Sequence, residues 1–159
     1  MGHWRIISLV LAIAISILHS SQALNEPEDF LHAHSCIRRL RDIKPLVWCP
    51  DLAKSAQAWA DKRKDCKLLP SEKVGENMAQ GPNINASYGV NMWVEERPNY
   101  DYDKNQCKPG LECTHYLQVT WNTTERVGCG IAKCDPPSKN NIIVCNYDPP
   151  GNVVGQRPY

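Results

Sequence analysis

Eight cysteines in a chain of 159 residues constrain the fold more than any other feature of the sequence. All of them lie between Cys36 and Cys145, downstream of an apolar N-terminal segment. An even number of cysteines in a secreted chain predicts four disulfide bonds. Metal binding by the thiols is the weaker interpretation, because the chain has no Cys-x-x-Cys pair and the compartment is oxidising.

The N-terminal segment predicts secretion. Arg5 precedes an apolar run over 6–18, and Ser21-Gln22-Ala23 then places small residues at the positions that signal peptidase reads. About a dozen apolar residues are too few to span a bilayer. We therefore expect a signal peptide at 1–23, cleaved after Ala23. An uncleaved anchor is the alternative, and no other apolar run predicts an integral membrane segment in the mature chain.

The charge of the mature chain is balanced. Removing Arg5 leaves 17 basic and 17 acidic residues, so the formal net charge is zero. A balanced charge gives no support for nucleic acid or an anionic membrane as partner. The length fits one domain. Two sequons, at Asn85 and Asn122, predict glycosylation on exposed loops or turns.

Apolar periodicity predicts an α+β protein. The predicted helices cover 27–43, 51–66, 86–96 and 113–121, and a β-hairpin covers 127–134 and 141–147. The segment 68–85 is expected to be irregular because it contains Pro70, Gly75, Gly81 and Pro82. A polar loop at 99–111 and a tail at 148–159 complete the chain.

Strand geometry narrows the disulfide pairing. Cys129 and Cys134 are five residues apart on one predicted strand, so they point to opposite faces and should not pair. Cys145, on the facing strand, is the candidate partner of Cys129. Cys107 and Cys113 flank the Pro109-Gly110 turn and can close a small loop. Elimination then leaves Cys66–Cys134 and Cys36–Cys49 as candidate pairs.

Three polar side chains are candidates for chemistry. Glu76 lies next to Gly75, Glu96 lies at the end of a predicted helix, and His115 lies in a segment between two cysteines. Two carboxylates and an imidazole can hold a divalent metal or share acid–base work. Spacing alone does not distinguish this arrangement from three ordinary surface or hydrogen-bonded side chains.

Five segments together resemble the CAP superfamily of cysteine-rich secretory proteins, antigen five and pathogenesis-related proteins, and are most similar to the plant class-one members. They are Gly75–Asn77, Met92–Glu96, Cys113–Trp121, Val127–Gly130 and Cys145–Asn152. The resemblance covers essentially the whole mature chain. It implies a disulfide-stabilised three-layer α-β-α sandwich over 24–148, with the pairs Cys66–Cys134, Cys107–Cys113 and Cys129–Cys145. The pair Cys36–Cys49 lies outside the family pattern and rests on elimination.

The resemblance also implies a cleft with two histidines and two glutamates, which binds a divalent ion in some members. Glu76, Glu96 and His115 match three of the four residues, but the position of the first histidine is Pro70, which has no ligand atom. His34 matches a histidine outside this set. Because imidazole favours zinc and copper, we expect weak or absent transition-metal binding and no cofactor.

Two further segments match family features with a function. The loop that contains Trp93, Tyr100 and Tyr102 resembles the aromatic loop implicated in sterol binding; the alternative is that Trp93 is core and the tyrosines cover the surface. The tail 149–159 matches a defence-signalling peptide released from some plant members by cleavage before Pro149, and the alternative is a tail packed on the domain.

We therefore expect a secreted, apoplastic plant defence protein, monomeric, that binds a sterol or similar lipid and acts on a pathogen or cell-surface component. One rival function is a metal-dependent hydrolase or protease using Glu76, Glu96 and His115. Pro70 argues against it, and so does the lack of an evident base-activated nucleophile, since the thiols are expected to be oxidised. The other rival is a structural or partner-binding extracellular protein.

Overall fold

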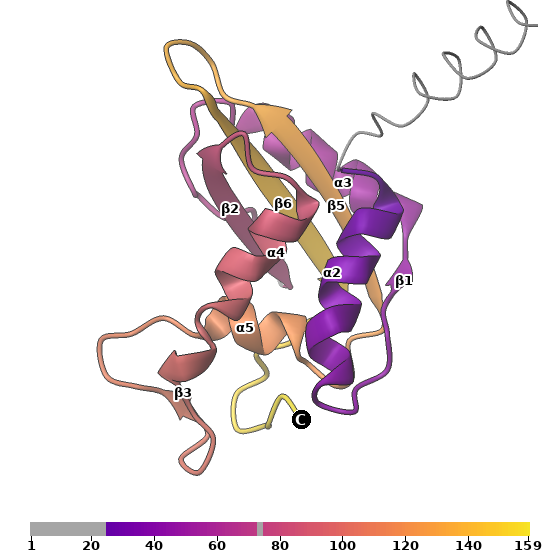
Figure 1. Ribbon diagram of the computed structural model, residues 1–159, viewed down its shortest axis with the longest axis vertical. Coiled ribbons are helices and arrows are strands. Elements are labelled where there is room, and N and C mark those ends of the chain that lie inside the picture. The colour runs from indigo at the N-terminus through magenta and orange to yellow at the C-terminus, as the bar shows by residue number, and fades with distance from the viewer. Residues whose placement is uncertain (1–24, 73–74) are drawn as a thin grey trace, which may run out of the picture.

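The computed structural model describes residues 25–72 and 75–159 (Figure 1). The predicted signal peptide and its cleavage site at Ala23 lie outside the described residues. The elements, in chain order, are α2 (Pro27–Arg39), β1 (Val47–Trp48), α3 (Pro50–Lys62), β2 (Glu76–Pro82), α4 (Ala86–Val94), the 3-10 turn η1 (Arg97–Asn99), β3 (Tyr100–Asp101), β4 (Gln106–Cys107), α5 (Thr114–Val119), β5 (Arg126–Lys133) and β6 (Asn140–Asp148).

A four-stranded sheet forms the middle layer, in the order β1-β5-β6-β2. β6 runs antiparallel to both of its neighbours, and β1 runs parallel to β5. α3 covers one face of the sheet, whereas α2, α4 and α5 cover the other (Figure 1). The predicted α+β fold with three α-β-α layers is confirmed. Among the described residues, no helix combines the length and apolarity needed to cross a membrane.

Two cores hold the layers together, one on each face of the sheet. The larger core packs apolar residues of α2, α4 and α5, among them Phe30, Val90 and Tyr116, against the sheet. The smaller core packs Ala56 and Ala60 of α3 against the other face. β5 and β6 therefore need apolar side chains on both faces of the sheet. This explains why β6 is buried over most of its length.

α2 and α3 end four residues earlier than apolar periodicity predicts, and α4 and α5 end two residues earlier. α2 ends at Arg39, because Asp42 adopts a left-handed backbone with φ of 54°. α3 ends at Lys62, and Cys66 has φ of 57°. A residue in this conformation terminates a helix, since it cannot continue the right-handed hydrogen-bond ladder.

The expectation that 68–85 is irregular is wrong in its second half, where β2 forms. β2 pairs with β6 without interruption, from Glu76 opposite Asn146 to Pro82 opposite Asn140. β2 lies at the end of the sheet order, and an edge strand tolerates Pro82 because one side of it needs no ladder donor. The glycine and proline that were interpreted as turn signals are therefore features of an edge strand.

Three of the four predicted disulfides are present, and one is wrong. The Cα atoms are 5.5 Å apart in Cys66–Cys134, 5.6 Å in Cys107–Cys113 and 4.0 Å in Cys129–Cys145. Cys36 and Cys49 are free thiols. Cys36 is exposed on α2 and Cys49 precedes α3, so they belong to helices on opposite faces of the sheet, which elimination by counting could not reveal.

Close contact between α3 and β5 depends on two glycines. A Cβ at Gly128 would lie 2.1 Å from the backbone nitrogen of Ala53, and a Cβ at Gly130 would lie 2.4 Å from the Cα of Gln57. The side chain of Gln57 then bonds to both backbone groups of Ile131, at 3.0 and 2.9 Å. The helix is therefore fixed on the strand by backbone contact and by a side-chain bridge.

Candidate functional site

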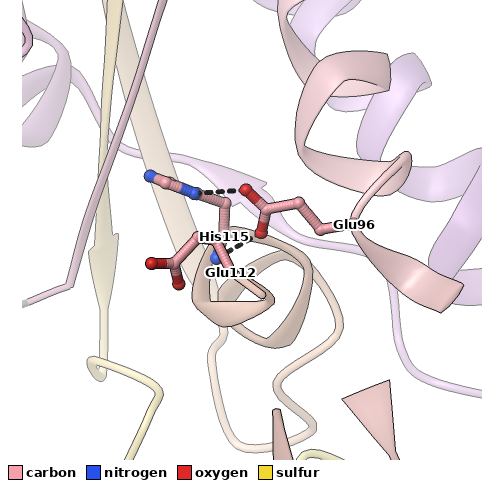
Figure 2. A group of neighbouring side chains, drawn as sticks. All are labelled: Glu96, Glu112 and His115. Atoms are coloured by element: carbon pink, nitrogen blue, oxygen red, sulfur yellow. Dashed lines mark hydrogen bonds and ion pairs between the residues drawn. The ribbon is translucent and has the colours of Figure 1, made fainter. Parts of the chain in front are cut away.

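Glu96 and His115 form the centre of the candidate site. Glu96 follows α4, and His115 lies in the first turn of α5. The Nδ1 atom of His115 lies 2.7 Å from Oε1 of Glu96. The other oxygen of Glu96 accepts the backbone N–H groups of His115 and Tyr116, at 3.0 and 3.3 Å. Figure 2 shows this carboxylate bonded to both the ring and the backbone of His115, so it joins α4 to the start of α5.

Glu112 is the third member of the group, and the sequence analysis missed it. Ligand atoms of Glu96, Glu112 and His115 all lie within 4.8 Å of one another (Figure 2). Oε1 of Glu112 accepts the backbone N–H groups of Cys113 and Thr114, at 3.2 and 2.9 Å, and the Thr114 hydroxyl. The detectable signal was an acidic residue directly before a helix, where the unpaired N–H groups attract a carboxylate.

The two carboxylates alter the acidity of His115. Burial disfavours the charged ring, but the hydrogen bond to Glu96 and the negative charges of Glu96 and Glu112 outweigh it and raise the pKa of His115. The bonds donated by Thr114 hold the pKa of Glu112 below its usual range. The two carboxylates therefore favour the protonated form of His115, and Glu96 is its ion-pair partner.

Glu76 does not join this group. Its carboxylate accepts both the backbone N–H and the hydroxyl of Ser71, each at 2.7 Å. Glu76 lines a hollow together with Trp59 of α3, and Pro70 lines a neighbouring hollow, also with Trp59. The structure thus brings two of the three predicted cleft residues together and places Glu76 apart from them, at the start of β2 and bonded to Ser71.

The donor set does not fit a resident zinc or copper ion. The group supplies one imidazole, and the Nδ1 atom of that imidazole is bonded to Glu96. Oε2 of Glu96 and Oε1 of Glu112 already accept backbone hydrogen bonds, which an incoming metal would have to displace. Carboxylate oxygens also favour harder ions than zinc or copper.

We expect zinc to bind this protein with a Kd weaker than about 1 µM, because each lost bond to Glu96 or Glu112 offsets part of the coordination energy. Isothermal titration of the wild type and of His115→Ala with zinc measures this. Submicromolar binding that disappears in His115→Ala would contradict the interpretation.

A buried polar network connects α2 to the same segment. Nδ1 of His34 donates to the carbonyl of Phe30 at 2.7 Å, and the hydroxyl of Tyr147 donates to Nε2 of His34 at 2.8 Å. Asn77 donates to the Tyr147 hydroxyl at 3.4 Å and to the carbonyl of His115 at 3.0 Å. His34, which matches a family histidine outside the cleft set, is therefore a structural residue.

The predicted aromatic loop separates into a core residue and two surface residues. Trp93 is 2% exposed and donates its Nε1–H to the carbonyl of Met78, so its assignment to a ligand-binding surface is wrong. Tyr100 and Tyr102, in contrast, line a cavity of about 490 Å³ between the end of α2, η1 and the tail. We call this cavity the tyrosine pocket; it is lined by Leu40, Arg41, Asp42, Arg97, Tyr100, Tyr102 and Tyr159.

The tail supplies one wall of the tyrosine pocket. The ring of Tyr159 stacks on Tyr102 with 5.6 Å between centroids, and its hydroxyl lies 2.8 Å from the hydroxyl of Tyr116. The end of the chain lies beneath α5, between α2 and the β3–β4 hairpin (Figure 1). Sequence reasoning missed Tyr159 because it is distant in the chain from the loop that it packs against.

The two sequons occupy different environments. Asn122 is exposed in the connection between α5 and β5. Asn85 is half-buried at the N-cap of α4, where its side chain accepts the backbone N–H of Tyr88 at 2.9 Å. Glycosylation at either position stays a prediction.

Comparison with known proteins identifies the family. The family model described as "Cysteine-rich secretory protein family" (CAP) matches residues 31–147. Pathogenesis-related leaf protein 6 of Solanum lycopersicum is 44% identical over 160 residues, which cover 96% of this chain and 97% of the relative. Pathogenesis-related protein 1B of Nicotiana tabacum is 42% identical over 163 residues, which cover 100% of this chain and 95% of the relative.

A solved structure agrees with this assignment. Venom allergen-like protein 4 of Schistosoma mansoni superimposes with a TM-score of 0.69 at 32% identity, covering 83% of this chain and 92% of that chain. The fold, the three disulfides and these relatives define one class. The chain belongs to the CAP family, and its curated relatives are plant pathogenesis-related proteins of type 1.

Proposed function

We propose that this chain is a secreted, apoplastic plant defence protein of the pathogenesis-related type 1 class that acts by binding a sterol or similar apolar ligand. The names of its plant relatives support the defence role. The predicted signal peptide at 1–23 supports secretion. The observation that carries the binding role is the tyrosine pocket.

The tyrosine pocket has the properties of a small-ligand site. Its volume of about 490 Å³ is in the usual range for such sites. Leu40 is 69% exposed and Tyr102 is 46% exposed, so both offer apolar area to a ligand. The loop is held in place by the Cys107–Cys113 disulfide and by a bond of 2.7 Å from Tyr100 to Asn105.

Binding is favoured over hydrolysis because the candidate catalytic residues bind one another. Both oxygens of Glu96 are bonded to His115, and Glu76 is bonded to Ser71. A hydrolase would need an acid–base pair directed toward a substrate, at hydrogen-bond distance from it. The bonds of Glu96 instead support a structural role, in which it joins the end of α4 to the start of α5.

We expect Tyr102→Ala and Tyr159→Ala each to weaken binding of a fluorescent sterol, dehydroergosterol, by about tenfold, since each removes a large aromatic wall. Fluorescence titration measures the affinity. Tyr88→Ala is the matched control, because Tyr88 is 59% exposed on α4 and does not line the pocket. Equal affinity in wild type and both pocket variants would contradict the assignment.

We also propose that the tail 149–159 is a releasable signalling peptide. Hydrogen bonds hold the tail to the domain along most of its length, so cleavage alone would not free it. They join the carbonyl of Pro149 to Thr124, Gly151 to Gln118, Asn152 to Thr114, the carbonyl of Gln156 to Asn105 and the carbonyl of Pro158 to Asn122, at 2.7 to 3.0 Å.

Cleavage before Pro149 would therefore leave a peptide that is still bound to the domain. We expect mass spectrometry of apoplastic fluid after immune stimulation to detect a fragment that begins at Pro149, and part of it to co-purify with the domain under native conditions. Persistent absence of the fragment would count against release. A fragment that never co-purifies would count against the retained peptide.

A further inference from the structure

The tyrosine pocket contains two arginines, and these point to a more specific ligand class than the proposed function requires. Arg41 follows α2 and Arg97 opens η1, and both line the pocket together with one acid, Asp42. The side chain of Arg41 is hydrogen-bonded to Tyr116, which fixes its guanidinium at the wall of the pocket. Two arginines and one aspartate line the pocket, so its charged groups favour an anion.

Two of the three tyrosine rings that line the pocket have partners on their faces. Tyr102 and Tyr159 stack on each other, with an interplanar angle of 18°. The guanidinium of Arg157 lies 4.6 Å from the centre of the Tyr102 ring, and that of Arg41 lies 5.0 Å from the centre of the Tyr159 ring. The ring edges are what remain for a ligand, and aromatic edges carry partial positive charge.

The tyrosine hydroxyls are also occupied. Tyr100 donates to Asn105, Tyr102 donates to the carbonyl of Tyr159 at 3.2 Å, and the hydroxyl of Tyr159 is bonded to Tyr116. A neutral apolar ligand can therefore fill the pocket, but it gains no hydrogen bond from hydroxyls that already have partners and no ion pair with the guanidinium groups. An anionic group meets complementary donors, because charged hydrogen bonds from arginine are stronger than neutral ones.

We propose that the tyrosine pocket selects organic anions, that is, a sulfonate, carboxylate or phosphate ester carried on an apolar body. The anionic group bonds to Arg41 and Arg97, and the apolar body lies against Leu40 and the edges of the tyrosine rings. This inference rests on the proposed apolar-ligand function and adds the charge of the ligand to it.

The test compares two fluorescent probes that share an apolar framework and differ in charge. 1-Anilinonaphthalene-8-sulfonate carries a sulfonate, whereas N-phenyl-1-naphthylamine is neutral. We expect the full chain to bind the anionic probe about tenfold more tightly. Added sodium chloride should weaken binding of the anionic probe and leave binding of the neutral probe unchanged, since salt screens the ion pair. Inorganic sulfate, which lacks an apolar body, should compete weakly.

Variants assign the effect to the pocket. Arg97→Gln should weaken binding of the anionic probe about fivefold and leave binding of the neutral probe unchanged. Arg39→Gln is the matched control, because Arg39 is exposed at the end of α2 and does not line the tyrosine pocket. Arg41→Lys should keep part of the selectivity, since lysine retains the charge without the planar fork.

The outcomes separate the two proposals. Equal binding of both probes, or an equal effect of Arg97→Gln and Arg39→Gln, would overturn anion selectivity and leave the apolar-ligand function in place. If inorganic sulfate binds as tightly as the anionic probe, the pocket is a site for the free anion alone. That result would overturn the requirement for an apolar body. Failure of both probes to bind would overturn both proposals.

Discussion

Replacing Arg38 with methionine lowers the free energy of unfolding by about 4 kcal/mol. Arg38 is fully buried in α2. Its guanidinium donates to four backbone carbonyls, those of Lys44, Val119, Trp121 and Thr124, at 2.7 to 3.1 Å. It therefore fastens the end of α2 to the segment between α5 and β5. Methionine fills similar space but leaves these buried carbonyls without their donor, and each costs about 1 kcal/mol or more.

Denaturant unfolding of the disulfide-intact protein measures this loss. Arg39→Met is the matched control, because Arg39 is exposed one position away, and its effect should stay within about 0.5 kcal/mol. Arg38→Lys should recover only part of the stability, since an ammonium cannot reach carbonyls in several directions. A loss below about 1 kcal/mol in Arg38→Met would show that the carbonyls find other partners.

The stability of the protein should fall by about 3 kcal/mol as the pH decreases from about 6.5 to about 4, through His34 alone. Burial lowers the pKa of His34 from 6.5 to about 4. Nδ1 donates to the carbonyl of Phe30 and Nε2 accepts from Tyr147, so the ring is held neutral. In this range the unfolded chain binds the proton and the folded chain does not, so stability rises with pH.

His115 has the opposite sign and acts in another range. Its pKa is raised in the folded state, so its contribution is complete below pH 6.5 and is lost as the pH rises through the raised value. The His34 contribution to the pH dependence between about 4 and 6.5 should therefore be lost in His34→Gln, which leaves the contribution of groups such as Glu112, and should persist in His32→Gln, where the histidine is exposed. An unchanged slope in His34→Gln, measured by denaturant unfolding across this range, would assign the effect to other groups.

Local patterns predicted much of the fold, and the failures have identifiable physical causes. Apolar periodicity located the main helices and the β5–β6 hairpin, because both faces of the sheet need apolar residues at regular spacing. It missed β2, since Gly81 and Pro82 are tolerated only because β2 is an edge strand. Strand parity excluded a Cys129–Cys134 bond, but the assumption that every cysteine pairs produced the wrong Cys36–Cys49 bond.

The candidate site was less predictable because most of it is assembled by tertiary contact. Glu96 and His115 could be selected from sequence, and they meet at 2.7 Å. Glu112 resembles a solvated acid in the sequence, and its position next to α5 gives it a role only once the helix forms. Arg41 and Tyr159 are separated by most of the chain, so no local pattern could bring them into the same pocket.

The most direct test of the account is a crystal structure of the full chain with dehydroergosterol bound. We predict ligand density in the tyrosine pocket, in contact with Leu40, Tyr102 and Tyr159, while the bond between Glu96 and His115 stays intact. Ligand density against His115 and Glu112, or at a site that touches none of the pocket residues, would contradict it.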